Sequence, residues 1–148
     1  MRIALSADHA GYDLKDILVA WLKEGGHEVL DLGTNGPASV DYPDFGARLA
    51  RALACGDAER GIAICGSGIG IAIAANRNPG CRCAQVNEPL SAALARTHND
   101  ANAIALGARL IGVDMAKACV TAFLTTDFEG GRHQRRVDML SRETEVHK

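Results

Sequence analysis

The sequence has no long apolar run. None of its hydrophobic stretches approaches the roughly 20 residues that a membrane-spanning helix needs. The first stretch, residues 3–5, is far too short for the apolar region of a secretory signal, since Asp8 interrupts it. We therefore expect a cytoplasmic protein without a membrane partner.

The sequence also has no large excess of charge of either sign. The net charge of the chain is -2, and acids and bases alternate along most of it, so a nucleic-acid partner is not expected. Repeats, low-complexity segments and linker composition are absent too. With 148 residues, 47% of them apolar, the chain is predicted to form one domain over 1–148.

The cysteines and histidines lack the spacing of a metal site. Neither CxxC pairs nor a zinc ligand set occurs, so we expect reduced thiols and no metal or cofactor. Four cysteines lie in or beside apolar patterns, where this residue is usually a small buried hydrophobe: Cys55, Cys81, Cys83 and Cys119.

What the chain does have is a regular alternation of strand and helix patterns. Predicted strands cover residues 2–6, 28–32, 61–64, 82–86 and 103–106. Predicted helices cover residues 14–22, 45–54, 69–76, 90–97 and 115–123. This order predicts an α/β fold with a five-stranded parallel sheet covered on both faces. A last helix, at about 133–145, has no strand after it and is expected to pack on a partner subunit.

In such a sheet, ligands bind beyond the carboxyl ends of the strands. The segments that follow the predicted strands are Asp8-His9, Gly33-Thr34, Cys65-Gly66-Ser67, Asn87-Glu88 and the segment 107–109. Polar, reactive and cationic side chains are concentrated there, so we expect the site at this edge.

The most distinctive of these segments is Cys-Gly-Ser-Gly-Ile-Gly, residues 65–70, where a strand enters a glycine-rich turn. Backbone N–H groups uncovered at a helix start suit a phosphate or a developing oxyanion. A Walker A lysine is absent, and Ile71 stands where a dinucleotide fingerprint needs glycine and a thiol phosphatase loop needs arginine. Nucleotide binding and phosphatase chemistry are therefore disfavoured.

Cys65 is the candidate base or nucleophile, because a thiolate is favoured beside a helix start. The alternative is that it only fills the end of a core strand. Ser67 is a plain helix cap or, in addition, a hydrogen-bond partner of Cys65 or a substrate.

Other candidates have structural alternatives as well. Asp8 and His9 either cap a helix or share the crevice with Cys65, and His98 ends a helix inside a polar cluster. Arg132 and Arg136, four residues apart, form either a phosphate clamp or a solvated basic turn. Arg109 offers a further cation. Glu88 and Asp100 are expected to be surface charges.

Five motifs in order carry a resemblance to a known family. They are Ser-Ala-Asp-His-Ala-Gly at 6–11, Asp-Tyr-Pro at 41–43, Cys-Gly-Ser-Gly-Ile-Gly at 65–70, His-Asn-Asp-Ala-Asn at 98–102 and Glu-Gly-Gly-Arg-His at 129–133. Together they resemble the signature of the ribose-5-phosphate isomerase B and galactose-6-phosphate isomerase family over essentially the whole chain.

The resemblance implies a three-layer αβα Rossmann-like sandwich and a homodimer, often paired into a tetramer, with active sites at the dimer interface. It implies an aldose–ketose isomerase that interconverts ribose 5-phosphate and ribulose 5-phosphate through a cis-enediolate. Cys65 would be the base, supported by Ser67. The backbone of Gly66, Gly68 and Gly70 would hold the enediolate oxygen.

The remaining roles also follow from the resemblance. His98 would open the furanose ring, with Asp8 at the other end of that proton transfer. Asn99 and Tyr42 would contact sugar hydroxyls. The phosphate would be held by His9 and Arg109 and, from the other subunit, by Arg132 and Arg136, with His133 nearby.

Two alternatives remain open. The same chemistry could act on allose 6-phosphate, galactose 6-phosphate or a tetrose 4-phosphate. The chain could also be a phosphosugar-binding module without catalysis, although such a module has no use for a reactive thiol.

Overall fold

The computed structural model describes residues 1–142 and has the predicted alternation of strands and helices. The strands are β1 (Arg2–Ala7), β2 (Glu28–Asp31), β3 (Arg60–Cys65), β4 (Cys83–Gln85) and β5 (Ala103–Gly107). The helices are α1 (Tyr12–Glu24), α2 (Tyr42–Ala54), α3 (Ile69–Ala75), α4 (Pro89–Asn99), α5 (Val113–Thr125) and α6 (Arg132–Leu140). Of the predicted last helix, residues 143–145 lie outside the described part. In residues 1–142, no helix is both long and apolar enough to span a membrane.

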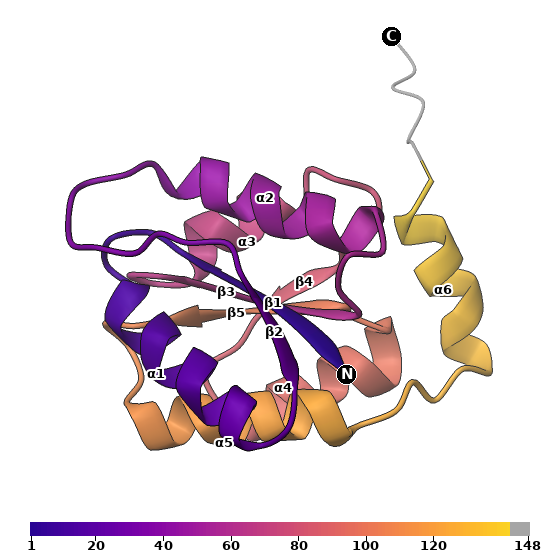
Figure 1. Ribbon diagram of the computed structural model, residues 1–148. Coiled ribbons are helices and arrows are strands. Elements are labelled where there is room, and N and C mark those ends of the chain that lie inside the picture. Colours follow the sequence, from indigo (N-terminus) through magenta and orange to yellow (C-terminus); the bar gives the residue numbers. More distant parts are fainter. Residues whose placement is uncertain (143–148) are drawn as a thin grey trace, which may run out of the picture.

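The strands form one parallel sheet in the order β2-β1-β3-β5-β4. The chain moves outward from β1 in one direction to β2 and in the other to β3, so the strand order switches between β1 and β3. Ala7 pairs with Ile64 and Cys65 pairs with Gly107 in the register. The carboxyl ends of β1, β3 and β5 therefore meet at one edge, on the left in Figure 1.

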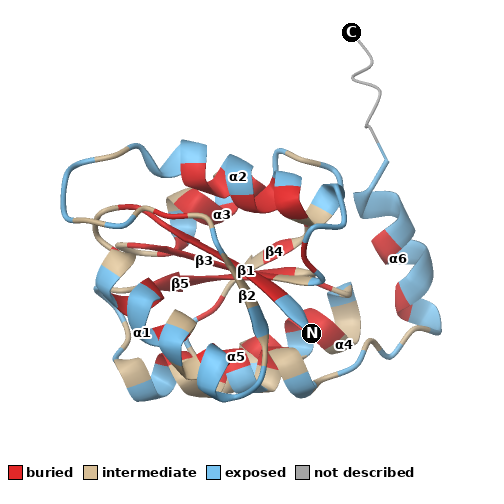
Figure 2. Cartoon of the chain, viewed as in Figure 1, coloured by how far each residue is buried: buried red, intermediate tan, exposed pale blue. Residues whose placement is uncertain are grey.

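Helices cover both faces of the sheet, which confirms the three-layer arrangement (Figure 1). On one face, α1, α4 and α5 pack on large aliphatic side chains such as Ile62 and Ile104. On the other, α2 and α3 pack on small ones such as Ala63 and Ala105. Buried residues line both interfaces in Figure 2, whereas α6 is mostly exposed.

The small-residue face lets its helices approach closely. A Cβ on Gly46 of α2 would lie 2.7 Å from Ala74 Cβ and 2.8 Å from the Ile71 carbonyl oxygen of α3. These are shorter than normal contacts, so only glycine allows α2 to lie this close to α3. The close packing brings the start of α2, with Tyr42, next to the turn that follows Cys65.

Three residues depart from the sequence-based expectation. Cys55, predicted to be buried, is exposed at the end of α2. Glu88 is not merely a surface charge, because its carboxylate caps α4 by accepting from the N–H groups of Leu90 (2.6 Å) and Ser91 (2.7 Å). Asp100 is also a cap, in a left-handed conformation at the other end of α4. Both acids therefore fix the ends of α4.

Lys15 is a buried cation that fixes the segment after β2. Its side chain is fully buried, and its ammonium contacts Asp16 (2.7 Å), both carboxylate oxygens of Asp31 (2.8 and 2.9 Å) and Asn35 (3.2 Å). Burial alone would lower the pKa of Lys15, but the hydrogen bonds and charges of Asp16 and Asp31 raise it above its ordinary value. The side chain therefore stays charged at neutral pH and anchors the loop that leads to Tyr42.

We expect Lys15→Met to lower the free energy of unfolding by about 2 kcal/mol, because Asp31 would lose its buried cation. The loss should stay below that of a fully buried pair, since the Asp31 side chain is 32% exposed. Urea unfolding at neutral pH measures it. Lys23→Met, an exposed position on the same helix, is the control and should change stability by less than about 0.5 kcal/mol. Equal stability of the two variants would contradict the anchoring role of Lys15.

Candidate active site

A hollow of about 330 Å³ opens at the carboxyl ends of β1, β3 and β5. This is the edge at which the parallel sheet predicts a ligand, next to the point where the strand order switches. It is lined by Asp8, Tyr42, Cys65, Gly66, Ser67, Gly70, Arg109 and Leu110. All of them except Leu110 were singled out from the sequence. Leu110 has no reactive or polar side chain, so no sequence pattern marked it.

Cys65, the last residue of β3, is positioned by the turn that follows it. The Gly68 N–H donates a hydrogen bond to Cys65 Sγ (3.2 Å). This contact holds the sulfur at the start of the turn. Cys65 is 4% exposed yet lines the hollow, so a ligand placed there would reach its sulfur from one side.

Gly68 and Gly70 of this turn are each required for a different steric reason. Gly68 has a φ of 77°, and a Cβ there would lie 2.9 Å from the carbonyl carbon of Leu106. On Gly70, a Cβ would lie 2.7 Å from the Tyr42 ring, so the absence of a side chain lets Tyr42 lie over the turn. The Gly68 N–H, expected from the sequence to face a ligand, is instead used on the cysteine itself.

Asp8 and His9 follow β1 at the same edge. Asp8 Oδ1 accepts from the N–H groups of Ala10 (2.9 Å) and Gly11 (3.2 Å), so this residue both caps the turn and lines the hollow. His9 Nδ1 accepts from the Val40 N–H (3.2 Å). In a neutral ring this leaves the proton on Nε2, which can then donate to an anion.

Ser67 and Arg109 complete this half of the site. Ser67 Oγ accepts from the Ile69 N–H (3.2 Å), but the N-cap of α3 is Gly68 and not Ser67, which the sequence had suggested. The side-chain amide of Gln85, in β4, donates to the Ser67 carbonyl oxygen (3.1 Å) and fixes the turn; no sequence pattern indicated this contact. The Arg109 N–H donates to the Gly66 carbonyl oxygen (3.0 Å), and its exposed guanidinium lies beside Gly66.

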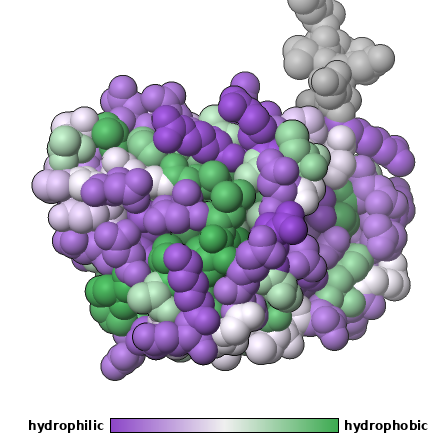
Figure 3. Space-filling view, in the orientation of Figure 1, coloured by the Kyte–Doolittle hydropathy of each residue, from purple (hydrophilic) through white to green (hydrophobic). Residues whose placement is uncertain are grey.

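The other predicted site residues form a second group elsewhere. His98 and Asn99 end α4, and the His98 ring stacks on His133 of α6 with centroids 4.6 Å apart and planes 20° apart. Arg132 and Arg136, also on α6, are exposed. The side of α6 that faces outward in Figure 3 is mostly hydrophilic.

The two groups lie at opposite ends of the strands. The carbonyl oxygen of Asn99 accepts from Arg82 Nε (3.2 Å), and Arg82 directly precedes β4. In the sheet register, Cys83 pairs with Ala103, and Ala103 pairs with Gly61, so these residues lie at the same height along the strands. Cys65 lies four residues further along β3 than Gly61. That separation is about 13 Å along the strand direction alone. In Figure 1, α6 accordingly stands at the edge where the strands begin. One chain therefore does not bring His98 to Cys65.

His98, His133 and Glu129 could, by their residue types, hold a metal ion. Within residues 1–142, this is the group of His, Cys, Asp and Glu whose donor atoms lie within 4.8 Å of one another. The imidazole rings are nearly parallel, so their in-plane lone pairs do not point at a common centre. His133 is 6% exposed, and its Nε2 lies 3.7 Å from Glu129 Oε2 without a hydrogen bond. The group as it stands is arranged for stacking and ion pairing. Glu129 was missed as a partner because nothing in the sequence links it to His98.

Comparisons with known proteins agree with this geometry. The family model described as Ribose/Galactose Isomerase matches residues 3–140. Ribose-5-phosphate isomerase B of Escherichia coli is 46% identical over 140 residues, which cover 95% of this chain and 94% of that protein.

Solved structures are similar over the same length. Ribose-5-phosphate isomerase B of Clostridium thermocellum superposes with a TM-score of 0.94 at 48% identity and covers 95% of each chain. The enzyme of Mycoplasma genitalium, solved with bound ribulose-5-phosphate, gives 0.90 at 41% identity, with 95% of this chain and 94% of that one covered. The chain therefore belongs to the ribose/galactose isomerase family of sugar phosphate isomerases.

Proposed function

We propose that this protein interconverts ribose 5-phosphate and ribulose 5-phosphate through a cis-enediolate, with Cys65 as the base. The observation that carries the proposal is the placement of Cys65 Sγ in the hollow, with the Gly68 N–H donating to it. The names of the relatives support the substrate, including the Mycoplasma genitalium enzyme with bound ribulose-5-phosphate.

The proposed chemistry moves one proton between neighbouring carbons. The Cys65 thiolate removes the proton from C2 of the open-chain aldose, and the electron pair of that C–H bond forms the C1–C2 double bond of the enediolate. The negative charge collects on the carbonyl oxygen, where the backbone N–H groups of Gly66 and Gly70 would hold it. A proton passes from the C2 hydroxyl to the C1 oxygen, and the thiol returns its proton to C1 while the C2–O bond becomes the carbonyl of the ketose. No resident metal or cofactor takes part, and we place the reaction in the cytoplasm.

Ring opening needs a second proton-transfer group, and we assign it to His98 of a second copy, with Asp8 opposite. His98 of the same chain is at the wrong edge of the sheet for this step. Asn99 would arrive with His98 and bind a sugar hydroxyl, as would Tyr42 from the chain that carries Cys65. A homodimer would then have two complete sites, each built from both subunits.

An exposed apolar surface on α3 and α4 is suited to this pairing. The side chains involved are Ile69, Ile73, Leu90 and Leu94, which are 54, 62, 66 and 40% exposed. They flank the edge strand β4, and each helix contributes two of them, four residues apart. Large side chains this exposed, on helices at either face of the edge strand, favour an interaction surface there.

A two-fold axis through this surface would pack α4 of one copy antiparallel to α4 of the other. α4 begins at Pro89, after the carboxyl end of β4, and ends at Asn99 at the opposite edge. Antiparallel packing puts the end of one α4 beside the start of the other. His98 of one copy would thus come to the edge that holds Cys65 of its partner.

The phosphate would lie between cations of the two copies. His9 and Arg109 are at the edge that holds Cys65, while Arg132 and Arg136 are exposed on α6 beside the stacked His133. Forked guanidiniums are well matched to phosphate oxygens. The length of sugar accepted would be set by the distance between Cys65 and these cations, so allose 6-phosphate, galactose 6-phosphate and tetrose 4-phosphates are the competing substrates.

Wild-type protein is expected to convert ribose 5-phosphate faster than allose 6-phosphate or erythrose 4-phosphate, without added metal. Cys65→Ala should lower kcat by about 10³-fold, because the base is removed while the fold is kept. Aldose–ketose conversion and denaturant unfolding measure the two properties. Cys55→Ala is the control and should keep full activity, because this exposed cysteine lies at the end of α2 that is remote from Tyr42 and the hollow. A fully active Cys65→Ala would refute the assignment of the base, and a faster reaction with another phosphosugar would change the substrate.

Mixed dimers test whether the site is shared. Cys65→Ala and His98→Ala should each be inactive as homodimers. Mixed dimers of the two variants should show about half of the wild-type activity, because one of the two sites in each is intact. Activity is measured on mixed dimers purified through two different tags. If mixed dimers stay inactive while both variants fold and pair, Cys65 and His98 do not act across the interface.

A further inference from the structure

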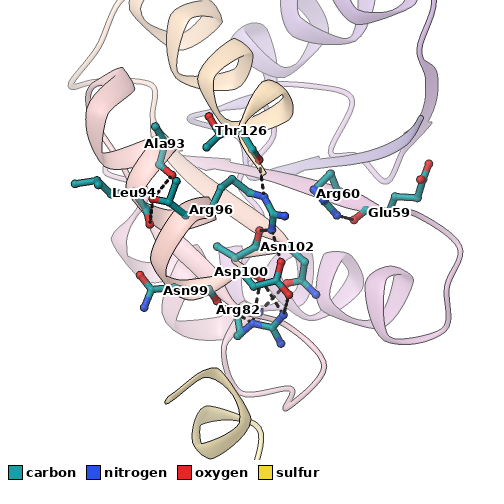
Figure 4. A network of polar contacts seen from close by, with 12 residues as sticks. Glu59, Arg60, Arg82, Ala93, Leu94, Arg96, Asn99, Asp100, Asn102 and Thr126 are labelled. Carbon is teal, nitrogen blue, oxygen red and sulfur yellow. Dashed lines mark hydrogen bonds and ion pairs between the residues drawn. The ribbon is translucent and has the colours of Figure 1, made fainter. Parts of the chain in front are cut away.

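Three charged side chains fix the end of α4, and we call them the α4 clasp: Arg82, Arg96 and Asp100. The Asp100 carboxylate lies between the two arginines, with Oδ1 2.8 Å from Arg96 Nη1 and Oδ2 3.1 Å from Arg82 Nη2 (Figure 4). Arg96 is buried, at 4% exposure. Arg60 lies nearby, and its pKa is lowered first by burial and then by the charge of Arg96, while Asp100, Glu59 and Asp127 act in the opposite direction.

The clasp also binds the backbone on which His98 and Asn99 stand. Arg82 Nε donates to the Asn99 carbonyl oxygen (3.2 Å), and Arg82 Nη2 donates to that of Asp100 (2.8 Å). Arg96 Nη1 donates to the Ala101 carbonyl oxygen (2.6 Å). These carbonyls would otherwise be left unpaired where the helix ends, and cations are favourable there.

One clasp side chain and two backbone N–H groups join the end of α4 to neighbouring elements. Arg96 Nε donates to the Thr126 carbonyl oxygen (3.2 Å) just after α5, and the Glu129 N–H donates to the Thr97 carbonyl oxygen (3.1 Å). The Arg82 N–H donates to Asn102 Oδ1 (2.7 Å), so the start of β4 is included. Figure 4 shows these partners converging on the end of α4 from separate elements. His98, stacked on His133, is therefore supported from several sides.

This arrangement exceeds what ending a helix requires. A glycine in the left-handed conformation after the last turn is the usual solution. Here that conformation, with a φ of 44°, is held by Asp100, which has a Cβ and is clamped by two arginines. This cluster of three charges, of which Arg96 is buried and Arg82 and Asp100 are 21 and 35% exposed, points to a need for accurate placement of this helix end.

We propose that the α4 clasp is a positioning device that holds His98 and Asn99 in the geometry in which a second copy uses them. The inference rests on the proposed function, in which these two residues serve the partner's site. The clasp residues do not touch the substrate; they act through the α4 backbone, from which His98 projects one residue before Asn99. Displacement of a catalytic group by about 1 Å can cost up to about 100-fold in rate, so loosening the clasp should appear in kcat.

The test uses Arg82→Met, which removes the guanidinium group of a side chain that is 21% exposed. As a homodimer it should fold and show kcat lowered by about 10- to 100-fold. Arg82→Lys, which keeps the charge but loses the fork, should fall in between. Arg77→Met is the matched control, because Arg77 is an exposed arginine between α3 and β4, and it should leave kcat unchanged.

Mixed dimers separate positioning from general damage. Paired with Cys65→Ala chains, Arg82→Met chains should regain activity, because the intact site then takes Cys65 from the variant and His98 from its partner. Paired with His98→Ala chains, they should regain none. Unchanged kcat in the homodimer, or equal activity in both pairings, would overturn the inference.

Two further measurements keep the outcomes distinct. If Cys65→Ala and His98→Ala fail to complement each other, the shared site of the proposed function fails, whatever Arg82→Met does. If Arg82→Met does not fold, Asp100→Asn takes its place, because asparagine accepts the left-handed conformation and loses only the charge. Asp100→Asn should give the same pairing pattern with a smaller loss of kcat, and full activity of its homodimer would overturn the inference.

Discussion

The direction of the parallel sheet is the constraint on which the site depends. Every strand ends at one edge, and every helix that returns from it ends at the other. Cys65 closes β3 and is therefore fixed at the first edge, whereas His98 and Asn99 close α4 and are fixed at the second. No side-chain rotation brings these groups together. A reaction that needs both must use two chains, and the exposed apolar side chains of α3 and α4 suit their pairing.

Each half of the site is held by hydrogen bonds that involve backbone groups. At the first edge, the Gly68 N–H fixes the Cys65 sulfur, and Gly70 leaves room for the Tyr42 ring. At the second edge, Arg82 and Arg96 bind the carbonyl oxygens of residues 99–101. Both arrangements restrict the reactive group before a ligand binds, which lowers the entropy lost in reaching a productive geometry.

The sequence predicted the fold well, and most of the residues it singled out after the strands line one hollow. Strand and helix periods placed all five strands and the order of the helices, because the local pattern of buried positions determines them. The helix boundaries differed where capping residues determine them. Helix α2 begins at Tyr42 rather than at residue 45, with a proline in its first turn. Helix α4 is longer than predicted and is capped by Glu88 and Asp100. Features made by distant residues escaped prediction. The burial of Lys15 and the stacking of His98 on His133 depend on contacts that no local pattern encodes.

Specific activity toward ribose 5-phosphate, followed over a dilution series with the molecular mass recorded at each concentration, decides whether one chain suffices for catalysis. If the site is built from two chains, specific activity should fall in step with the fraction of dimers and return on concentration, while the monomer stays folded. A folded monomer that keeps the full specific activity would contradict the shared site.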